Sequence, residues 1–325
     1  MEQRLTHILT LALRHHVTDI HFNIRREESC QIEMRVNGVM KRIHEKPEDI
    51  RFFHYLMYRA NLDLSASLEP QTGRFETEVN HTTLALRFAV VSSYGMTSGV
   101  LRILNNHGEL NTSLLSTDPS QAVWFQEICL HRSGLYVFSG PTGSGKTTTL
   151  YTILNEVEGK KIFTLEDPIE VLNEKYVQLA VNDRQNLSYA DGIKQLMRHD
   201  PDIVMIGEIR DSIAAEMAVR CALTGHLVVT SLHSGSCTAA IARLEDLGVS
   251  PLQLSDILAG MSNQRLYDTT NGAKIGVYEI MNRKEVTYYL THHETSSEFI
   301  PLSTRIKTAM ELGQIDPSQA AQDLD

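Results

Sequence analysis

Cysteine is scarce in this chain, and so are long apolar runs. The four cysteines are far apart and form no Cys-x-x-Cys pair: Cys30, Cys129, Cys221 and Cys237. This spacing predicts neither a zinc site nor a disulfide framework, and it favours reduced thiols. No segment reaches the ~18 consecutive apolar residues of a membrane span. Charged Arg14 soon interrupts the apolar start that a signal peptide would need. We therefore expect a cytoplasmic protein that reaches a membrane only through a partner.

The chain also lacks an excess of basic residues. Its 325 residues carry a formal net charge of −10, whereas proteins that coat nucleic acid need a basic surface. Direct nucleic-acid binding is therefore not expected. The hydrophobic content of 42% is ordinary for a protein with packed cores, and the length is sufficient for two domains.

Residues 1–107 predict an N-terminal α+β domain with an antiparallel sheet. Apolar residues at helical spacing predict a helix from Leu5 to Leu13, and Pro47 opens a second helix with acidic residues in its first turn. Alternating apolar and polar residues predict strands at residues 18–24, 31–36, 39–43, 73–79, 83–91 and 99–104. Asn37-Gly38 predicts a hairpin turn between two of them.

The rest of the chain predicts a doubly wound α/β domain. Residues 108–120 are polar and rich in turn formers, which indicates a linker. Residues 121–250 alternate helices with short apolar runs, as buried parallel strands do. The runs lie at residues 135–138, 161–165, 203–206 and 227–232. Residues 251–325 are expected to be mostly helical, with a helix through Met261 and an apolar run at residues 274–280.

A glycine-rich loop follows the first of these buried runs. It matches the P-loop spacing G-x-x-x-x-G-K-[ST] and is followed by a predicted helix. Its residues are Gly140, Pro141, Thr142, Gly143, Ser144, Gly145, Lys146, Thr147 and Thr148. The loop is expected to cradle phosphates with backbone N–H groups, while Lys146 reaches the β- and γ-phosphates and Thr147 ligates Mg²⁺. The sequence therefore predicts a nucleoside triphosphate site.

Carboxylates follow two other predicted strands at the edge where α/β sheets bind their ligands. Glu208 comes after Ile203–Ile206, and Gly207 stands where most P-loop proteins carry a metal-binding Asp. Glu208 is thus the candidate general base, with a solvated strand-end carboxylate as the alternative. Glu166, in an acidic segment that ends at Glu170, is expected to help order Mg²⁺ and water, unless the segment is a loop in salt bridges.

Four further side chains are candidates for the same site. His226 and His233 bracket one predicted strand and are hypothesised to sense the γ-phosphate or relay nucleotide state; a lone histidine is more often packed or exposed. Arg87 and Arg102 lie on strands of the first domain. A ring-shaped NTPase can take a charge-stabilising arginine from a neighbouring domain or subunit, although each could be a plain surface arginine.

Together these motifs resemble the secretion ATPase superfamily, which includes type II secretion, type IV pilus and Gram-positive competence motors. Gly140–Thr149 resembles the Walker A motif, Thr164–Glu170 the Asp box, Asp200–Asp211 the atypical Walker B motif with Arg210, and Thr224–Ser234 the His box. Thr18-Asp19-Ile20-His21 and Arg35-Val36-Asn37-Gly38 resemble signatures of the N-terminal domain. Arg87 and Arg102 sit where the family has its interdomain arginines.

The resemblance implies the function of the chain in several respects. It implies a PAS-like N-terminal domain, a RecA-like core, and a homo-hexameric ring that binds ATP and Mg²⁺ between its two domains. Closure of those domains would turn a polytopic membrane platform protein of a pilus system, with the ring on the inner face of the membrane. Glu166 and Glu208 would then lie near the metal.

Departures from the family pattern favour one subfamily. Gln264-Arg265-Leu266 is retained, but residues 267–274 are short and hold no cysteine, so no zinc module is expected. No extra N-terminal domain is expected, and nothing after residue 280 resembles the retraction signature Ala-Ile-Arg-Asn-Leu-Ile-Arg. The chain therefore most resembles a ComG-type competence ATPase, which assembles a pseudopilus for DNA uptake.

Three alternatives remain open from the sequence. The first is a pilus retraction or type II secretion motor of the same superfamily. The second is a nucleotide-gated regulatory protein that does not hydrolyse ATP, although retention of Lys146, Thr147 and Glu208 argues against it. The third is a DNA-translocating RecA-like motor, which the acidic balance disfavours.

Overall fold

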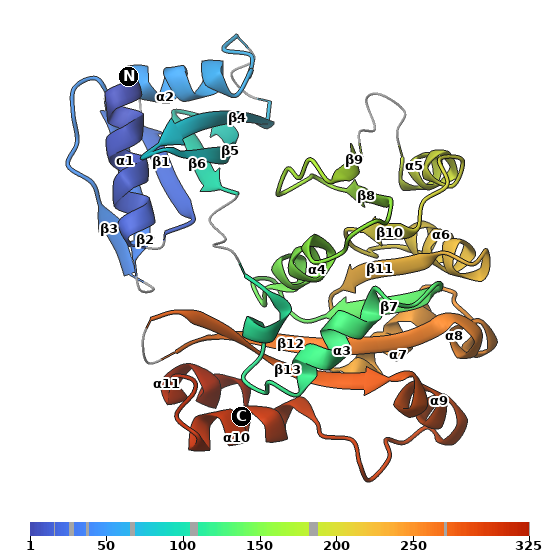
Figure 1. Cartoon of the computed structure of the whole chain (residues 1–325). Coiled ribbons are helices and arrows are strands. Elements are labelled where there is room, and N and C mark those ends of the chain that lie inside the picture. The colour runs from blue at the N-terminus through green and yellow to red at the C-terminus, as the bar shows by residue number, and fades with distance from the viewer. Residues whose placement is uncertain are drawn as a thin grey trace. The chain divides into compact units, whose positions relative to one another are not determined.

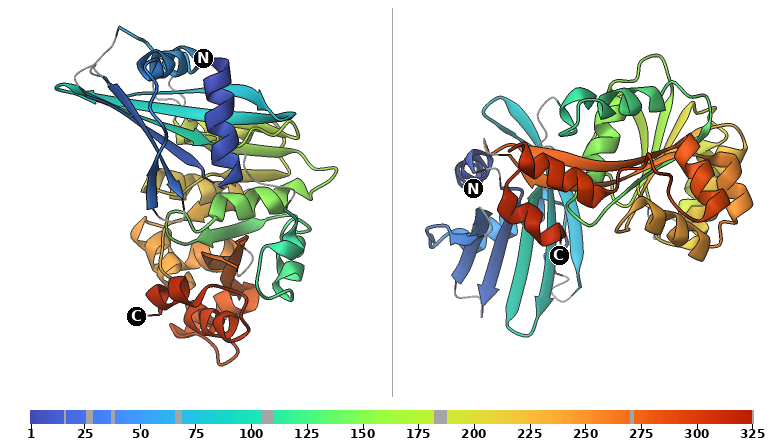
Figure 2. Two further views of the ribbon diagram at one scale, coloured as in Figure 1. Left: turned by 90° about the vertical axis from the view of Figure 1, so that its left-hand side faces the viewer. Right: turned by 90° about the horizontal axis from the view of Figure 1, so that it is seen from below.

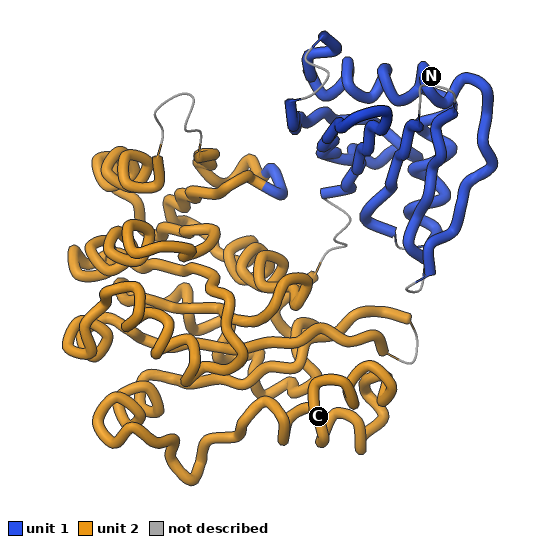
Figure 3. Tube along the Cα trace, turned by 180° about the vertical axis from the view of Figure 1, so that it is seen from behind, with its two compact units in different colours: residues 1–108, 170–172 blue, residues 109–169, 173–325 orange. Residues whose placement is uncertain are grey.

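The chain forms two compact units (Figure 3). The computed structural model describes residues 1–15, 17–25, 29–36, 39–65, 69–104, 110–181, 188–269 and 272–324. Unit 1 comprises residues 1–108 and 170–172, and unit 2 comprises residues 109–169 and 173–325. Each unit has its own hydrophobic core. Asn37-Gly38, the expected hairpin turn, lies outside the described residues.

Unit 1 is a six-stranded antiparallel sheet with helices on one face, and α1 lies across it (Figure 2). Its elements are α1 (Glu2–Arg14), β1 (Asp19–Arg25), β2 (Ser29–Val36), β3 (Val39–Arg42), α2 (Asp49–Arg59), β4 (Gln71–Val79), β5 (Thr82–Ser93) and β6 (Met96–Ile103). The strand order is β3-β2-β1-β6-β5-β4. The predicted α+β architecture of this part is confirmed.

Aromatic side chains form the centre of the unit 1 core. Phe22 of β1, Phe88 of β5, and Phe52 and Phe53 of α2 are almost fully buried. Their contacting ring centroids lie 5.2–6.1 Å apart in tilted or edge-on arrangements, which suit the aromatic quadrupole. Burial alternates along β1, so one face of the sheet packs on the helices and the other carries polar side chains.

Unit 2 is built on a seven-stranded, mostly parallel sheet (Figure 1). Its elements are η1 (Thr112–Leu114), α3 (Gln121–Ile128), β7 (Gly134–Ser139), α4 (Lys146–Asn155), β8 (Ile162–Glu166), β9 (Tyr176–Ala180), α5 (Tyr189–Leu196), β10 (Ile203–Ile206), α6 (Ser212–Leu223), β11 (Leu227–Leu232), α7 (Cys237–Asp246), α8 (Pro251–Ile257), β12 (Leu258–Asp268), β13 (Lys274–Asn282), α9 (Arg283–His292), α10 (Leu302–Glu311), α11 (Pro317–Ala320) and η3 (Ala321–Asp323). The strand order is β13-β12-β7-β11-β10-β8-β9.

Helices cover both faces of this sheet. Leu135 and Val137 of β7 belong to a core shared with α6, α7 and α8. Trp124 of α3 packs on the opposite face, with its ring 6.1 Å from that of Tyr136 and 6.0 Å from that of Phe138. Figure 1 shows α3 and α4 on the side of the sheet away from α6 and α7. A strand buried on both faces is largely apolar, which is why β7, β8, β10 and β11 were recognisable.

The C-terminal part departs from the expected helical structure. The expectation of a helix through Met261 is wrong beyond Ile257, where α8 ends and β12 begins. Strand β12 pairs parallel with β7 and antiparallel with β13. The apolar residues at this boundary have helical spacing: Leu254, Ile257, Leu258 and Met261. That spacing arises here from two adjacent elements that bury their side chains in one core, so the periodicity was misleading.

Residues 110–120, the described part of the expected linker, pack on unit 2. The backbone N–H and Oγ1 of Thr112 donate to the carboxylate of Glu156, at the end of α4, at 2.7 and 2.8 Å. Ser116 forms a bridge with Gly276 of β13. Residues 105–109 lie outside the described part of the chain. The described part of this segment therefore contacts both the helix that follows the P-loop and strand β13.

All four cysteines are buried and free. Burial raises the pKa of Cys30 and Cys129 to about 12 and that of Cys221 to about 11. Thiols with such pKa values stay protonated at neutral pH and are poor nucleophiles. Within the described ranges, no helix has both the length and the apolar character to cross a membrane.

Candidate active site

The P-loop connects β7 to α4 and has little room for side chains at its start. Gly140 has φ of 149°, and a Cβ there would lie 2.6 Å from both the backbone O of Gln264 and Oγ of Ser144. Gly145, with φ of 87°, is the N-cap of α4. Both positions require glycine on conformational or steric grounds. The loop can therefore bring its backbone N–H groups close to a ligand at the N-terminus of α4.

Lys146 is held inside this loop. Its side chain is buried, and Nζ donates hydrogen bonds to the carbonyl oxygens of Gly140 and Pro141 at 2.9 and 3.0 Å. Thr147 and Thr148 follow in the first turn of α4 and are partly exposed. A glycine-lined loop, an ammonium group and hydroxyls at a helix N-terminus fit a nucleoside triphosphate with its Mg²⁺.

Glu208 lies just beyond the carboxyl end of β10 and is held on both oxygens. His233 Nε2 lies 2.9 Å from Oε1, and Arg210 Nε donates to Oε2 at 2.8 Å. Arg210 Nη1 also donates to Asp167, after β8, at 2.9 Å. The hydrogen bond to Glu208 raises the pKa of Arg210. The structure thus brings Glu208, Arg210 and His233 into one network at the edge of the sheet.

The backbone on either side of Glu208 explains why this residue lies in the turn between β10 and α6. Gly207 N donates to Leu165 O at 2.8 Å, and a Cβ on Gly207 would lie 3.3 Å from Cγ of Glu166. Asp211 then accepts a hydrogen bond from Ala214 N at 2.8 Å and caps α6. The chain therefore turns between a tight strand end and a helix start, and the side chain of Glu208 stays 17% exposed at this turn.

Glu166 occupies a different environment at the end of β8. Only 3% of the residue is exposed, and its Oε1 accepts hydrogen bonds from the hydroxyls of Tyr151 and Thr164, both at 2.7 Å. Burial, with Glu166 as a further cause, raises the pKa of Tyr151, so this phenol keeps the proton that it donates. Glu166 is therefore fixed by hydroxyl donors inside the protein.

The two predicted histidines lie at opposite ends of β11. Gly140 N donates to Leu232 O, so His233, which follows β11, lies at the P-loop edge. His226 precedes β11, and its backbone O accepts from Gly134 N at the start of β7. The structure therefore does not bring His226 to the P-loop edge. A local contact, Nδ1 of His226 with Oγ1 of Thr224 at 3.1 Å, occupies its side chain.

Arg87 and Arg102 are cross-strand partners on the polar face of the unit 1 sheet. Arg87 of β5 stands opposite Arg102 of β6 and, on its other side, opposite Arg74 of β4. Arg102 also donates to Asp19 of β1 at 2.6 Å. Burial, followed by the charge of Arg102, lowers the pKa of Arg87. Three guanidinium groups thus form one row, which we call the arginine row; Arg74 was missed because strand register cannot be counted from one sequence.

Two amide side chains of β12 support the P-loop. The sequence analysis did not assign them to the site. Gln264 is fully buried and donates from Nε2 to Ser144 O at 2.7 Å and to Thr149 Oγ1 at 3.2 Å. Asn263 Nδ2 donates to Oγ of Ser139 at 2.8 Å and to Ser234 O at 3.1 Å. The sequence shows two consecutive amides beside an apolar run, but their burial against the P-loop depends on tertiary packing.

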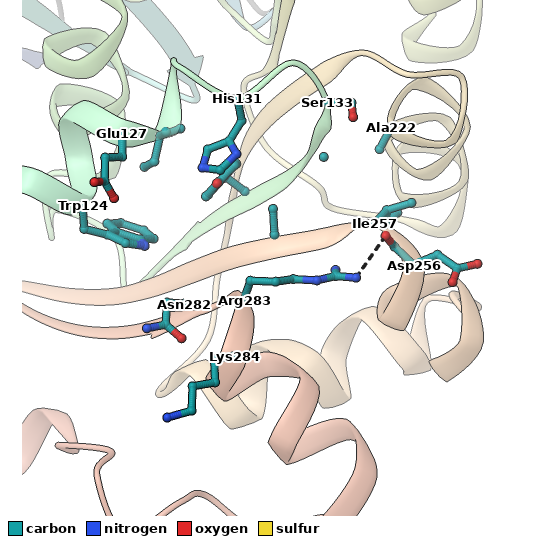
Figure 4. A pocket seen from close by; sticks show the side chains of 14 residues that line it. Trp124, Glu127, His131, Ser133, Ala222, Asp256, Ile257, Asn282, Arg283 and Lys284 are labelled. Carbon is teal, nitrogen blue, oxygen red and sulfur yellow. Dashed lines mark hydrogen bonds between the residues drawn. The ribbon is translucent and has the colours of Figure 1, made fainter.

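A hollow of about 430 Å³ lies at the opposite, amino edge of the sheet (Figure 4). It is walled by Trp124 and His131 on one side and by Arg283 on the other. Arg283 is engaged in structure, since its Nη1 donates to Leu258 O at 2.8 Å. Glu127 and Lys284 bring opposite charges to the lining. None of the predicted site residues lines this hollow. Among the described residues, no group of three or more His, Cys, Asp or Glu could hold a metal ion.

A family model matches most of the chain. The model described as "Type II/IV secretion system protein" matches residues 1–299. The chain belongs to this family. The resemblance inferred from the motifs is confirmed, and this secretion-family protein is an ATPase.

Several curated proteins are similar to this secretion ATPase. The competence protein ComGA of Bacillus subtilis is 34% identical over 256 residues, which cover 77% of this chain and 72% of that protein. ComGA of Halalkalibacterium halodurans is 31% identical over an alignment of 339 positions, which covers 96% of this chain and 96% of that protein. Type II secretion system protein E of Pseudomonas aeruginosa is 36% identical over 264 residues, or 80% of this chain and 52% of that protein. The chain thus spans about half the length of the type II secretion relatives that it matches.

Solved structures share the fold. The pilus retraction motor PilT with bound ADP has a TM-score of 0.73 and 25% identity, with 98% of this chain and 96% of PilT covered. The Legionella pneumophila ATPase DotB has a TM-score of 0.78 and 20% identity over 97% of this chain and 93% of DotB. These similarities confirm the predicted combination of an N-terminal α+β domain with a P-loop α/β core.

Proposed function

We propose that this chain is the ATP-hydrolysing motor that assembles a competence pseudopilus for DNA uptake. The observation that carries the proposal is the network of Glu208, His233 and Arg210, which lies at the same sheet edge as the P-loop. This network provides a positioned carboxylate beside a phosphate cradle, as ATP hydrolysis requires.

Each predicted residue has a role in this proposal. Residues 140–148 hold the triphosphate, and Lys146 exchanges its loop carbonyl partners for phosphate oxygens. Thr147 ligates Mg²⁺, which when bound neutralises phosphate charge. Glu208 positions and deprotonates the attacking water, while Glu166 orders solvent near the metal. Arg87 and Arg102 act as charge-stabilising arginines from a neighbouring domain or subunit.

The assembly role rests on the comparisons with competence proteins. ComGA of H. halodurans matches 96% of both chains, so the likeness extends over both units. We infer a homo-hexamer that acts on a polytopic membrane platform protein from the cytoplasmic side, without direct nucleic-acid binding. Purified protein is then expected to show slow, Mg²⁺-dependent ATPase activity that DNA does not stimulate.

Two measurements test the proposal. Lys146→Ala should abolish ATP hydrolysis, because the ammonium that binds the phosphates is removed. In the parent organism the same substitution should abolish both pseudopilus fibres and transformation. If Lys146→Ala hydrolysed ATP as fast as the parent protein, the assignment of this site would fail.

A retraction or type II secretion motor is the second candidate. The similarity to PilT over 98% of this chain and the 36% identity to type II secretion protein E favour it. Deletion of the gene distinguishes the roles. Loss of an assembly motor leaves cells without fibres, whereas loss of a retraction motor leaves fibres that no longer shorten, and loss of a secretion motor leaves exoproteins inside the cell.

A further inference from the structure

Unit 1 contains a groove of about 400 Å³ between α1 and the edge of its sheet. Four apolar side chains form its floor: Leu11 of α1, Met34 and Val36 of β2, and Ile43. Helix α1 borders the groove with residues at spacing i, i+3, i+7 and i+11, which lie along one stripe of a helix. We call this feature the α1–β3 groove. All of its lining residues belong to unit 1.

A buried ion pair fixes the shape of the groove. Arg4 donates from Nε and Nη2 to the two carboxylate oxygens of Asp49 at 3.0 and 2.9 Å, and both side chains are almost fully buried. Nη2 also donates to His44 O at 2.9 Å, and Lys46 N donates to Asp49 at 2.8 Å. The segment 44–46 is thereby fastened to α1. A groove that is already formed loses less entropy on binding.

The rim of the α1–β3 groove is uniformly basic or imidazole. It is made by His7, His15, Lys41, Arg42, His44 and Lys46, and among the residues that the structure describes no carboxylate lines the groove. The side chain of Arg42 is 60% exposed, and its Nε lies 3.6 Å from Glu33, which offsets part of its charge. This concentration stands out in a chain of net charge −10. Residues 1–108 carry 13 Lys and Arg against 12 Asp and Glu.

We propose that the α1–β3 groove binds an acidic amphipathic segment of a partner protein. The apolar side chains of that segment would enter the floor at Leu11 and Met34, and its carboxylates would meet Lys41, Arg42 and Lys46. Strand β3 is the edge of the sheet and its four residues are exposed, so an extended segment can also pair with its backbone. A flat anionic membrane would satisfy the rim but not a recessed apolar floor.

Titration of the full-length protein with a labelled peptide tests this proposal. The probe is a fluorescein-labelled 12-residue peptide of alternating leucine and glutamate, and the control peptide has lysine for glutamate. We expect saturable binding of the acidic peptide in fluorescence anisotropy, on the order of micromolar, and no binding of the basic one. Binding should weaken as salt rises, because the rim charges are exposed.

Matched variants locate the site. Lys41→Glu with Lys46→Glu should weaken binding at least about tenfold, the effect expected for reversing two rim charges. The control, Lys175→Glu with Lys307→Glu, makes the same charge change at exposed positions of unit 2 and should bind like the parent. Leu11→Gln should weaken binding without changing charge. Unchanged basal ATPase activity and circular dichroism would show that the variants fold.

Specific results would overturn the proposal. Equal peptide affinity of the two double variants would remove the α1–β3 groove as the site. Binding of phosphatidylglycerol vesicles or DNA, but not of the acidic peptide, would assign the basic rim to a different ligand. Loss of oligomers in Lys41→Glu with Lys46→Glu, without any peptide binding, would assign the groove to a second copy of this chain. None of these outcomes depends on the proposed role in competence.

Discussion

At the scale of single residues, two carboxylates compete for the role of general base. Glu166 is 3% exposed and surrounded by hydroxyl donors, whereas the side chain of Glu208 is 17% exposed. A base must reach the water that it activates. His233 and Arg210 bind Glu208 but leave it accessible, so Glu208 is the better candidate for the general base. Glu166 is the carboxylate that is held more firmly in place.

Glu208→Gln is expected to bind ATP with unchanged affinity but to lose turnover. The amide keeps the shape of the side chain and cannot accept a proton, so kcat should fall by about 10²–10⁴. ATP affinity is measured with a fluorescent analogue, and kcat by phosphate release. Glu166→Gln is the matched comparison. Normal turnover in Glu208→Gln would transfer the base role to Glu166.

Tyr151→Phe is expected to destabilise the protein through Glu166. The substitution removes a 2.7 Å hydrogen bond to a buried carboxylate, which should lower the free energy of unfolding by roughly 1–3 kcal/mol. Urea denaturation measures the change. Tyr58→Phe, at a residue that is 72% exposed, serves as the control. Equal stability of the two variants would contradict a supporting role for this hydroxyl.

At the scale of elements, the sequence predicted strands wherever burial left a clear pattern. Apolar runs revealed β7, β10 and β11, which are buried along their whole length. Strand β12 was hidden because its buried interior includes Ser262, Asn263 and Gln264. Strand β9, whose pattern is mostly half-exposed, was also missed. Periodicity reports burial of apolar side chains, so it cannot find strands that bury polar ones.

The part of the candidate site that could be predicted consists of residues that follow the carboxyl ends of parallel strands, because these ends lie together. The P-loop spacing and the strand end before Glu208 were sufficient to place those residues together. For the histidines the same reasoning was available, because only the residue after a parallel strand reaches the P-loop edge, and this selects His233 over His226. The partners of Glu166 and the support from Gln264 depend on tertiary packing, which local sequence does not encode.

Gln264→Leu is expected to weaken ATP binding more than turnover. The substitution leaves Ser144 O without its 2.7 Å donor, and the loss of about 1 kcal/mol at the P-loop should raise KM for ATP about fivefold. Steady-state kinetics measure KM and kcat separately. Gln195→Leu, at an exposed position of α5, is the matched control. A fall in kcat at constant KM would show that Gln264 acts on catalysis instead of on the loop.

At the scale of the whole molecule, unit 1 carries the arginine row, to which the proposed function assigns Arg87 and Arg102. Like charges in neighbouring cross-strand positions are unfavourable, yet Arg74, Arg87 and Arg102 stand in register across β4, β5 and β6. Asp19 accepts a hydrogen bond from Arg102, and the negative charges of Glu170 and Asp19 act on Arg87. A row of guanidinium groups can contact a phosphate anion, and in the proposed ring that anion can belong to another subunit.

Arg87→Ala is therefore expected to lose ring-dependent ATPase activity while ATP binding stays intact, and Arg102→Ala should behave alike. A mixing experiment gives the sharper test. Lys146→Ala keeps the arginines and Arg87→Ala keeps the P-loop, so each is inactive alone. If the arginines act between subunits, mixed rings should regain part of the parent activity, because some sites combine an intact P-loop with an intact neighbour. No recovery in rings shown to be mixed would place Arg87 in its own subunit's site, and full activity of Arg87→Ala alone would return it to the role of a surface arginine.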